Sequence, residues 1–226
     1  MIEPATGKTK VIAYEDHTIL FCYQSNPGWT HPYYYENGDE NLSDAGCGIF
    51  SLCHAVEWMH GIRLSAEEMA DFSMANGGRG DDGTDRPGLL HGLMVTGMGK
   101  KIGLEYREDG LRNDLDALWE HMSTGKGTAF CNLRVGHIVA IVDARIVNGE
   151  KQLLVIDSVA ESSRDMVRNH VREVIPQSLV IRHYKNKQGL YVGQEHRYAM
   201  FWVTADLPKD FNLIYKVEPE RVNASK

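Results

Sequence analysis

The chain has 226 residues, of which 42% are hydrophobic, enough to bury a sizeable core, and we expect a single domain over residues 1–226. Its net charge at pH 7 is −7. The longest basic run is Lys100-Lys101, which disfavours a nucleic-acid groove and an anionic membrane surface as partners. No apolar stretch approaches the roughly 18 residues of a spanning helix, so membrane insertion is not expected.

The N-terminal segment lacks the basic and apolar regions of a signal peptide. We therefore expect a cytoplasmic protein as written, while a chain that begins after cleavage and is secreted or delivered to a host stays open. The four cysteines form no CxxC pair, which disfavours a disulfide framework and a structural zinc site. We expect no metal and no cofactor, and the sequence leaves the oligomeric state open.

The first third of the chain predicts two short strands followed by a long buried helix. Residues 11–14 and 18–23 have strand character around a polar turn. The aromatic cluster Tyr33-Tyr34-Tyr35 is either a surface that lines a cleft for an extended peptide or a cover for the loop after it. Apolar residues at helical spacing predict a helix that starts at Gly46-Cys47-Gly48 and ends before Gly61.

The middle of the chain is helical around one glycine-rich loop. A capping box predicts a short helix from Ser65 to Met74. Residues 76–83 form the glycine-rich loop, which is either a lid or a loose connection. A helix follows over Pro87 to Lys101 and then a short strand over residues 103–106. Asn113 or Asp114 caps a further helix that carries Trp119 and Met122.

From Thr128 onward the sequence has mostly strand character. The expected strands cover residues 129–133, 136–142, 152–157, 179–184 and 197–203, with a helix over 163–171. Helices come first and an antiparallel sheet second, so the predicted fold class is α+β. We expect a helical part over about residues 43–125 and a sheet part over about residues 126–216.

Cys47 is the candidate nucleophile because it lies at the start of a helix, between two glycines. The free backbone N–H groups and the helix dipole at this position favour a thiolate over a thiol. The glycines should also leave open space beside the sulfur for a substrate. Cys22, Cys53 and Cys131 lie within apolar runs and are expected to be buried packing residues.

A cysteine nucleophile needs a base, and the base needs an orienting partner. Asn148-Gly149 is a strong hairpin signal that joins a strand beginning near His137 to a strand ending at Asp157. Antiparallel pairing should bring these two ends within reach of a hydrogen bond. His54 lies on the same helix as Cys47 but about 10 Å along its axis, too far to act as the base.

These residues resemble the papain-like cysteine peptidases, in particular the C39-like branch to which the bacteriocin-processing peptidases belong. The matching segments are Tyr23-Gln24, Gly46-Cys47-Gly48-x-x-Ser51, Gly136-His137-Ile138-Val139 and Ile156-Asp157. The resemblance implies a papain-like fold in which Cys47 attacks, His137 is the base and Asp157 orients it. It further implies that Gln24 donates a hydrogen bond to the oxyanion. Ile49 and Ser158 stand where the family more usually has proline.

The expected function is a thiol hydrolase that cleaves peptide or isopeptide bonds through an acyl-enzyme on Cys47. Transfer of the acyl group to an amine would use the same residues and stays open as an alternative. A catalytically silent papain-like domain that binds a peptide is another alternative, which the departures at Ile49 and Ser158 permit. In each case the expected partner is a peptide or a protein.

Overall fold

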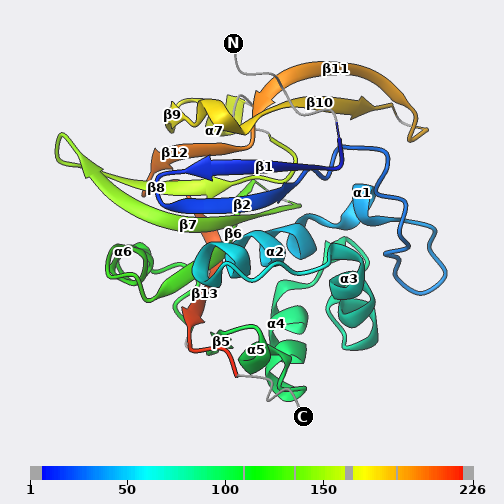
Figure 1. Ribbon diagram of the computed structural model, residues 1–226, viewed down its shortest axis with the longest axis horizontal. Coiled ribbons are helices and arrows are strands. Elements are labelled where there is room, and N and C mark those ends of the chain that lie inside the picture. Colours follow the sequence, from blue (N-terminus) through cyan, green and yellow to red (C-terminus); the bar gives the residue numbers. More distant parts are fainter. Residues whose placement is uncertain (1–6, 109, 135, 161–164, 187, 221–226) are drawn as a thin grey trace.

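The computed structural model describes residues 7–108, 110–134, 136–160, 165–186 and 188–220. Helices and antiparallel sheets combine in these ranges, so the predicted α+β class is confirmed (Figure 1). Within them, no helix is long and apolar enough to cross a bilayer.

Most of the helices precede the main run of strands. The helices are α1 (Leu42–Ala45), α2 (Cys47–His60), α3 (Ala66–Ala75), α4 (Arg86–Val95), α5 (Met98–Lys101), α6 (Leu115–Ser123) and α7 (Asp165–Arg168), with a 3-10 turn at Pro176–Ser178. The strands before residue 110 are β1 (Thr9–Tyr14), β2 (His17–Cys22), β3 (Arg79–Gly80), β4 (Gly83–Thr84) and β5 (Leu104–Tyr106). The later strands are β6 (Gly127–Arg134), β7 (His137–Val147), β8 (Glu150–Ile156), β9 (Val171–Val174), β10 (Leu179–Lys185), β11 (Tyr191–Tyr198), β12 (Met200–Thr204) and β13 (Lys209–Lys216).

The main sheet has seven antiparallel strands in the order β5-β13-β6-β7-β8-β12-β9. Side chains of a strand alternate between the two faces, and β7 follows this rule. Ile138 and Ala140 join a core cluster that includes α2, whereas Val139 and Ile141 join a cluster that includes α6. The sheet is therefore buried on both faces around its centre.

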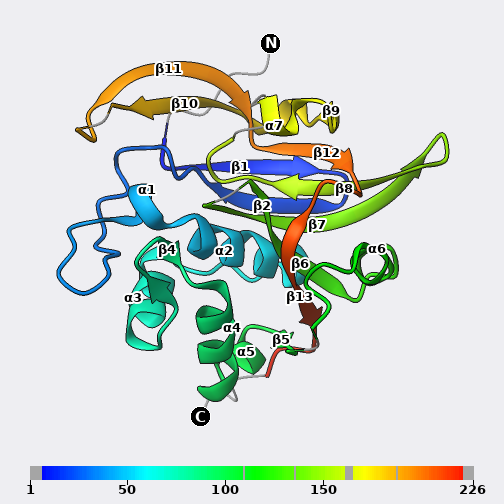
Figure 2. The same cartoon turned by 180° about the vertical axis from the view of Figure 1, so that it is seen from behind.

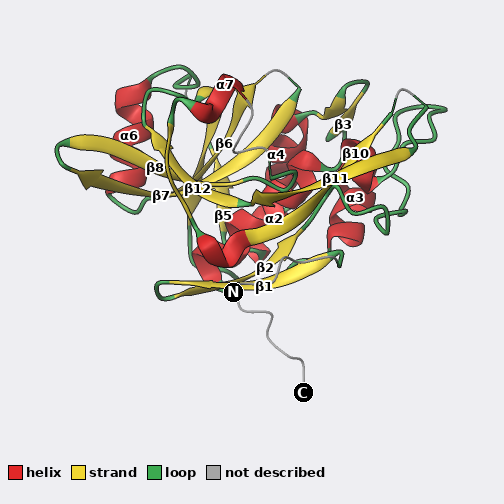
Figure 3. Ribbon diagram, turned by 90° about the horizontal axis from the view of Figure 1, so that it is seen from above, coloured by secondary structure: helices red, strands yellow, loops and turns green. Residues whose placement is uncertain are grey.

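Helix α2 lies at the centre of the molecule. Every residue from Cys47 to Met59 is buried, and the helix packs against β2 on one side and against β6 and β7 on another. Figure 3 shows α2 between the β1–β2 hairpin and the strands of the main sheet. The helix ends at Gly61, which adopts the left-handed conformation with a φ of 66°, as its sequence predicted.

The predicted β7–β8 hairpin is confirmed. Val147 pairs with Glu150 across a two-residue turn, and Asn148 and Gly149 both have positive φ, at 51° and 82°. A turn of this type matches the twist of the flanking strands. The hairpin thus carries the start of β7 and the end of β8 to the same end of the sheet (Figure 2).

Three predicted elements differ from the observed ones. The helix expected over Pro87 to Lys101 is two helices, because Gly97 between α4 and α5 has a φ of 73°. The strand expected over residues 197–203 is split between β11 and β12, since the N–H of Ala199 donates to Ser178 rather than to a strand partner. The helix expected over residues 163–171 is wrong at its end, because α7 stops at Arg168 and β9 begins at Val171; residues 163 and 164 lie outside the described ranges.

Candidate active site

Cys47 is the first residue of α2 and only 8% exposed. The glycines on either side do not leave open space, contrary to expectation. A Cβ on Gly48 would lie 2.5 Å from the Cβ of Thr84, and one on Gly46 would lie 2.5 Å from the carbonyl oxygen of Leu42. Glycine is needed here because β4 and α1 approach the start of α2 closely. The close approach of β4 makes it a wall beside the sulfur.

His137 and Asp157 form the predicted contact. His137 is the first residue of β7, Asp157 directly follows β8, and the His137 Nε2 lies 2.7 Å from the Asp157 Oδ1. Both side chains are buried. The same carboxylate oxygen accepts a 2.8 Å hydrogen bond from the N–H of Val159, so two donors hold the carboxylate in place.

Cys47 completes the arrangement, because its side chain and that of His137 interact and shift each other's pKa. Since Nε2 faces Asp157, Nδ1 is the ring nitrogen left for the sulfur. The hydroxyl of Ser51 donates to the carbonyl oxygen of Ile138 at 3.3 Å, which ties the first turns of α2 to the start of β7. The structure therefore brings Cys47, His137 and Asp157 together in that order.

The electrostatics of this group favour the ionised pair. Burial alone would raise the pKa of the Cys47 thiol, but the hydrogen bond and charge of His137, with backbone N–H groups of Ile138 and Gly48, lower it. Burial would lower the pKa of His137, but the charge and hydrogen bond of Asp157 and the contact with Cys47 raise it to about 10. Between these pKa values a thiolate faces an imidazolium.

The other three cysteines have the opposite electrostatics. Burial raises the pKa of Cys22 and of Cys131 to about 12, and it raises the pKa of Cys53 well above 9.0. All three are protonated near neutral pH. Cys47 is thus the one cysteine of the four whose environment produces a nucleophile, which agrees with the sequence analysis.

Gln24 lies beside Ser158, the residue after Asp157. Its N–H donates to the Ser158 carbonyl oxygen at 2.9 Å, and its Oε1 accepts from the Ser158 hydroxyl at 2.9 Å. These bonds fix the amide and leave its Nε2 as the donor end. Among the described residues, the hydrogen bonds of Gln24 go to Ser158 and not to Cys47. The role of Ser158 was missed because a serine after a strand has no distinctive signal.

His54 is structural, as its distance from Cys47 along α2 predicted. Its Nε2 accepts a 2.9 Å hydrogen bond from the N–H of Cys22. Burial lowers the pKa of His54 to about 3, so the ring is neutral and can keep this acceptor. The histidine joins α2 to β2 and takes no part in the site.

A cavity of about 560 Å³ opens beside Cys47 and His137. One wall is the glycine-rich segment, which is a short β3–β4 hairpin rather than a loose connection. Arg79 anchors it, because this buried side chain donates to the carbonyl oxygens of Tyr33 at 3.2 Å and Gly83 at 2.9 Å. The hairpin is therefore a fixed part of the cleft.

The aromatic cluster does not line this cavity, so the expected aromatic-lined cleft is wrong. Tyr33 is fully buried, and its hydroxyl bonds to those of Ser73 at 3.0 Å and Thr84 at 2.9 Å. Tyr34 and Tyr35 are each 43% exposed and lie outside the cavity lining. The cluster instead supports the back of the β3–β4 hairpin through Tyr33.

The cavity continues past a group of charged residues. Asp210 forms ion pairs with Arg86 and Arg112 and accepts a 3.2 Å hydrogen bond from the Asn132 amide. Arg112 and Pro87 also line a second cavity of about 400 Å³, which reaches Tyr106. The two cavities adjoin at these shared residues, and the second is lined by Phe211, Asn212 and Leu213 of β13.

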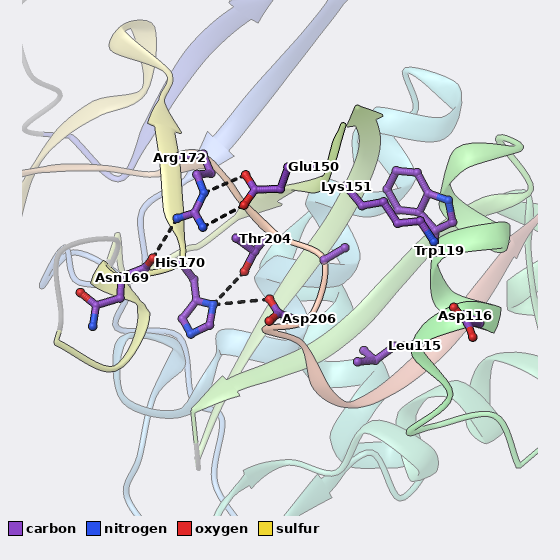
Figure 4. A pocket seen from close by; sticks show the side chains of 11 residues that line it. Leu115, Asp116, Trp119, Glu150, Lys151, Asn169, His170, Arg172, Thr204 and Asp206 are labelled. Carbon is purple, nitrogen blue, oxygen red and sulfur yellow. Dashed lines mark hydrogen bonds and ion pairs between the residues drawn. The ribbon is translucent and has the colours of Figure 1, made fainter. Parts of the chain in front are cut away.

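Another cavity, of about 480 Å³, lies between α6, β8 and the start of β9 (Figure 4). There the His170 Nδ1 lies 2.7 Å from the Thr204 hydroxyl and 3.6 Å from the Asp206 carboxylate. A base that relays a proton needs its two partners on different ring nitrogens. Since the same nitrogen of His170 faces both Thr204 and Asp206, this cavity lacks the arrangement of nucleophile, base and carboxylate that surrounds Cys47.

In the described ranges, no group of three or more His, Cys, Asp or Glu side chains is arranged to hold a metal ion. Comparisons of the chain with protein-family models, with curated proteins and with solved structures found no match. The functional interpretation therefore rests on the geometry and electrostatics of the Cys47 cavity.

Proposed function

We propose that this chain is a papain-like cysteine peptidase of the C39-like type, a hydrolase of peptide or isopeptide bonds. The observation that carries the proposal is the arrangement of three buried side chains beside a cavity, in which His137 lies between Cys47 and Asp157. Acyl transfer through a thioester needs three groups. They are a thiolate nucleophile, a base that can protonate the leaving group, and a carboxylate that orients this base.

The papain-like fold belongs to this proposal and is supported by the position of α2. A nucleophile at the start of a central buried helix, facing a histidine at the start of an antiparallel strand, is what the resemblance implies. The elements before residue 110 supply Gln24 and Cys47, and the main sheet supplies His137 and Asp157. The cleft lies where these two sets meet.

In the first half of the reaction the Cys47 thiolate attacks the carbonyl carbon of the scissile bond. The carbonyl oxygen becomes an oxyanion, for which the Cys47 N–H at the start of α2 and the Gln24 amide are the candidate donors. His137, protonated at Nδ1, gives its proton to the leaving nitrogen as the C–N bond breaks. An acyl-thioester on Cys47 and a free amine result.

In the second half His137, now neutral, takes a proton from a water molecule that attacks the thioester. The C–S bond then breaks and the carboxylic acid leaves, while His137 keeps the proton that it took from water, so the thiolate and the imidazolium are restored. Asp157 stays ionised throughout and holds the imidazole in the orientation that both halves require. An amine in place of water would give acyl transfer.

The test is digestion of a proteome-derived peptide library, with new termini identified by mass spectrometry. We expect cleavage by wild type, none by Cys47→Ala, and a fall in kcat of about 100-fold for Gln24→Ala. Because the hydrogen bonds of Gln24 go to Ser158 and Gln24 is not among the groups that shift the pKa of Cys47, alkylation of Cys47 in that variant should stay unchanged. Hydroxylamine added to the digest distinguishes the fates of the acyl-enzyme, since hydroxamates form only if an amine competes with water.

Two results would contradict the proposal. One is the absence of cleavage together with slow alkylation of Cys47, which would favour the silent peptide-binding domain. The other is cleavage that persists in Cys47→Ala, which would place the chemistry elsewhere.

A further inference from the structure

The cleft beside Cys47 is rich in carboxylates. Asp81, Asp82, Asp85 and Asp210 all line the cavity that contains the reactive pair. The thiolate and the imidazolium of that pair neutralise each other. The charge that a substrate meets is therefore set by these four aspartates and by the arginines near them.

Of the four aspartates only Asp210 has arginine partners, and four carboxylates against two arginines leave these residues of the cavity with a net charge of −2. Asp210 is paired with both Arg86 and Arg112, the two arginines of the cavity. In the ranges described, Asp81 and Asp82 form no ion pair, and their one mutual hydrogen bond runs from the Asp82 N–H to the Asp81 carboxylate at 3.0 Å. Asp85 is likewise exposed and outside every ion pair in those ranges.

These three aspartates line the same cavity as Cys47, and Thr84 brings their segment up to the start of α2. A Cβ on Gly48, the residue after Cys47, would be 2.5 Å from Thr84. Asp85 is adjacent to Thr84 in the chain, and Asp82 is two positions before it, so their Cα atoms lie within about 4 and 7 Å of Thr84. A lysine or arginine side chain next to a bond held at Cys47 is long enough to reach them.

The acidic wall is also rigid. Asp81 and Asp82 form the turn of the β3–β4 hairpin, and the buried Arg79 and Tyr33 hold its strands from behind. Because the backbone that carries these carboxylates is held before binding, it loses little freedom when a cation arrives. Among the cations that a peptide can bring to such a wall, a lysine ammonium or an arginine guanidinium forms charge-assisted hydrogen bonds with carboxylates.

We propose that this cleft selects peptides that carry a lysine or arginine within two residues of the scissile bond, with Asp81, Asp82 and Asp85 as the residues that determine the preference. The inference rests on the proposed peptidase function for its substrate. The acidity of the cleft can be tested apart from that function. An acidic side chain at the same position would be repelled, which adds discrimination.

The first experiment measures the charge at Cys47 without catalysis. Cys47 is labelled with a cationic methanethiosulfonate (trimethylammonium-ethyl) and with an anionic one (sulfonato-ethyl), and the ratio of the two rates is taken. The protein variant is the triple substitution Asp81→Asn, Asp82→Asn, Asp85→Asn. Its control carries the same three charge changes outside the cleft, at Asp16, Asp39 and Asp116.

We expect the cation-to-anion rate ratio to be about tenfold higher in wild type and control than in the triple variant. An exposed ion pair changes an affinity by about twofold to fivefold, and three act here. The difference should shrink as salt rises, because exposed charges are screened. Equal ratios in all three proteins would overturn the proposal.

The second experiment digests the peptide library with the same three proteins. We expect lysine and arginine to be enriched around the cleaved bonds for wild type and control and to lose that enrichment in the triple variant. For one cleaved lysine peptide, KM should rise about tenfold in the triple variant while kcat stays unchanged. Cleavage without enrichment would overturn the specificity and leave the peptidase function intact. If no protein cleaves any peptide, the peptidase function falls, and this substrate assignment falls with it.

Discussion

Replacement of His137 by alanine tests the site most directly. His137 lowers the pKa of the Cys47 thiol through its hydrogen bond and its charge, and burial acts in the opposite direction. Without the imidazole only burial and the two backbone N–H groups remain. We expect the pKa of Cys47 to rise above 9.0, its ordinary value.

The size of the effect follows from the thiolate population. A thiol with a pKa of 9 is about 1% ionised at pH 7, and this fraction falls tenfold for each lower pH unit. The intrinsic reactivity of a thiolate falls about threefold for each unit by which its pKa is lowered. Each unit by which His137 lowers the pKa of Cys47 therefore speeds alkylation about threefold, at a pH below the Cys47 pKa of both wild type and variant.

The assay is alkylation of Cys47 by limiting iodoacetamide from pH 5 to 9, with each cysteine followed by mass spectrometry. The wild-type rate should level off at a lower pH, whereas the rate of His137→Ala should rise about tenfold per pH unit up to pH 8. His137→Gln fills more of the buried space and guards against a folding defect, and His91→Ala, at an exposed position, is the control. Identical pH profiles for wild type and both His137 variants would refute the reasoning.

Two further substitutions test the supporting geometry. Asp157→Asn removes the charge that most strongly opposes the effect of burial on the pKa of His137. The fall in kcat/KM at alkaline pH should therefore move from about pH 10 to lower pH. An unchanged pH profile would argue against the pairing of Asp157 with His137. Gly48→Ala places a Cβ 2.5 Å from Thr84 and should destabilise the fold by about 1–3 kcal/mol, seen as a lower Tm. Gly80→Ala, whose Cβ would have only contacts of 3.7 Å or more, should leave Tm nearly unchanged, and equal Tm losses would contradict the packing argument.

The parts of the site that the sequence predicted are those that depend on local signals. Asn148-Gly149 determines a hairpin by its backbone preference alone, and that hairpin brings His137 and Asp157 to one end of the sheet. The start of α2 is likewise marked by the glycines and the apolar spacing after Cys47. In both cases neighbours in the chain decide the geometry.

The parts that were missed depend on contacts between distant segments. The β3–β4 hairpin has strands of two residues each, too short for any periodic pattern. Its own Arg79 and Thr84 bond to Tyr33, which lies 46 and 51 positions earlier in the chain. The grouping of Arg86 with Asp210 joins positions 124 residues apart. A single sequence contains no signal for such pairs.

The loss of open space beside Cys47 has a similar origin. Glycine at positions 46 and 48 predicts room for a substrate, because a sequence shows only that a side chain is missing. The structure shows Thr84 and Leu42 in the space that those side chains would have taken. The residues that face a glycine decide whether it opens a site or closes it.

Because all four free cysteines are buried, the rates at which their thiols are labelled report on whether the protein is folded. In the native state the pKa of one thiol is lowered, and the other three are protected by burial and by their raised pKa values. In an unfolded chain the four thiols would become chemically equivalent, so Cys47 would slow at low pH while the others speed up. A short pulse of labelling therefore counts native and opened molecules in one spectrum. Followed over denaturant concentration, it would show whether α2 and the main sheet open together or in separate steps.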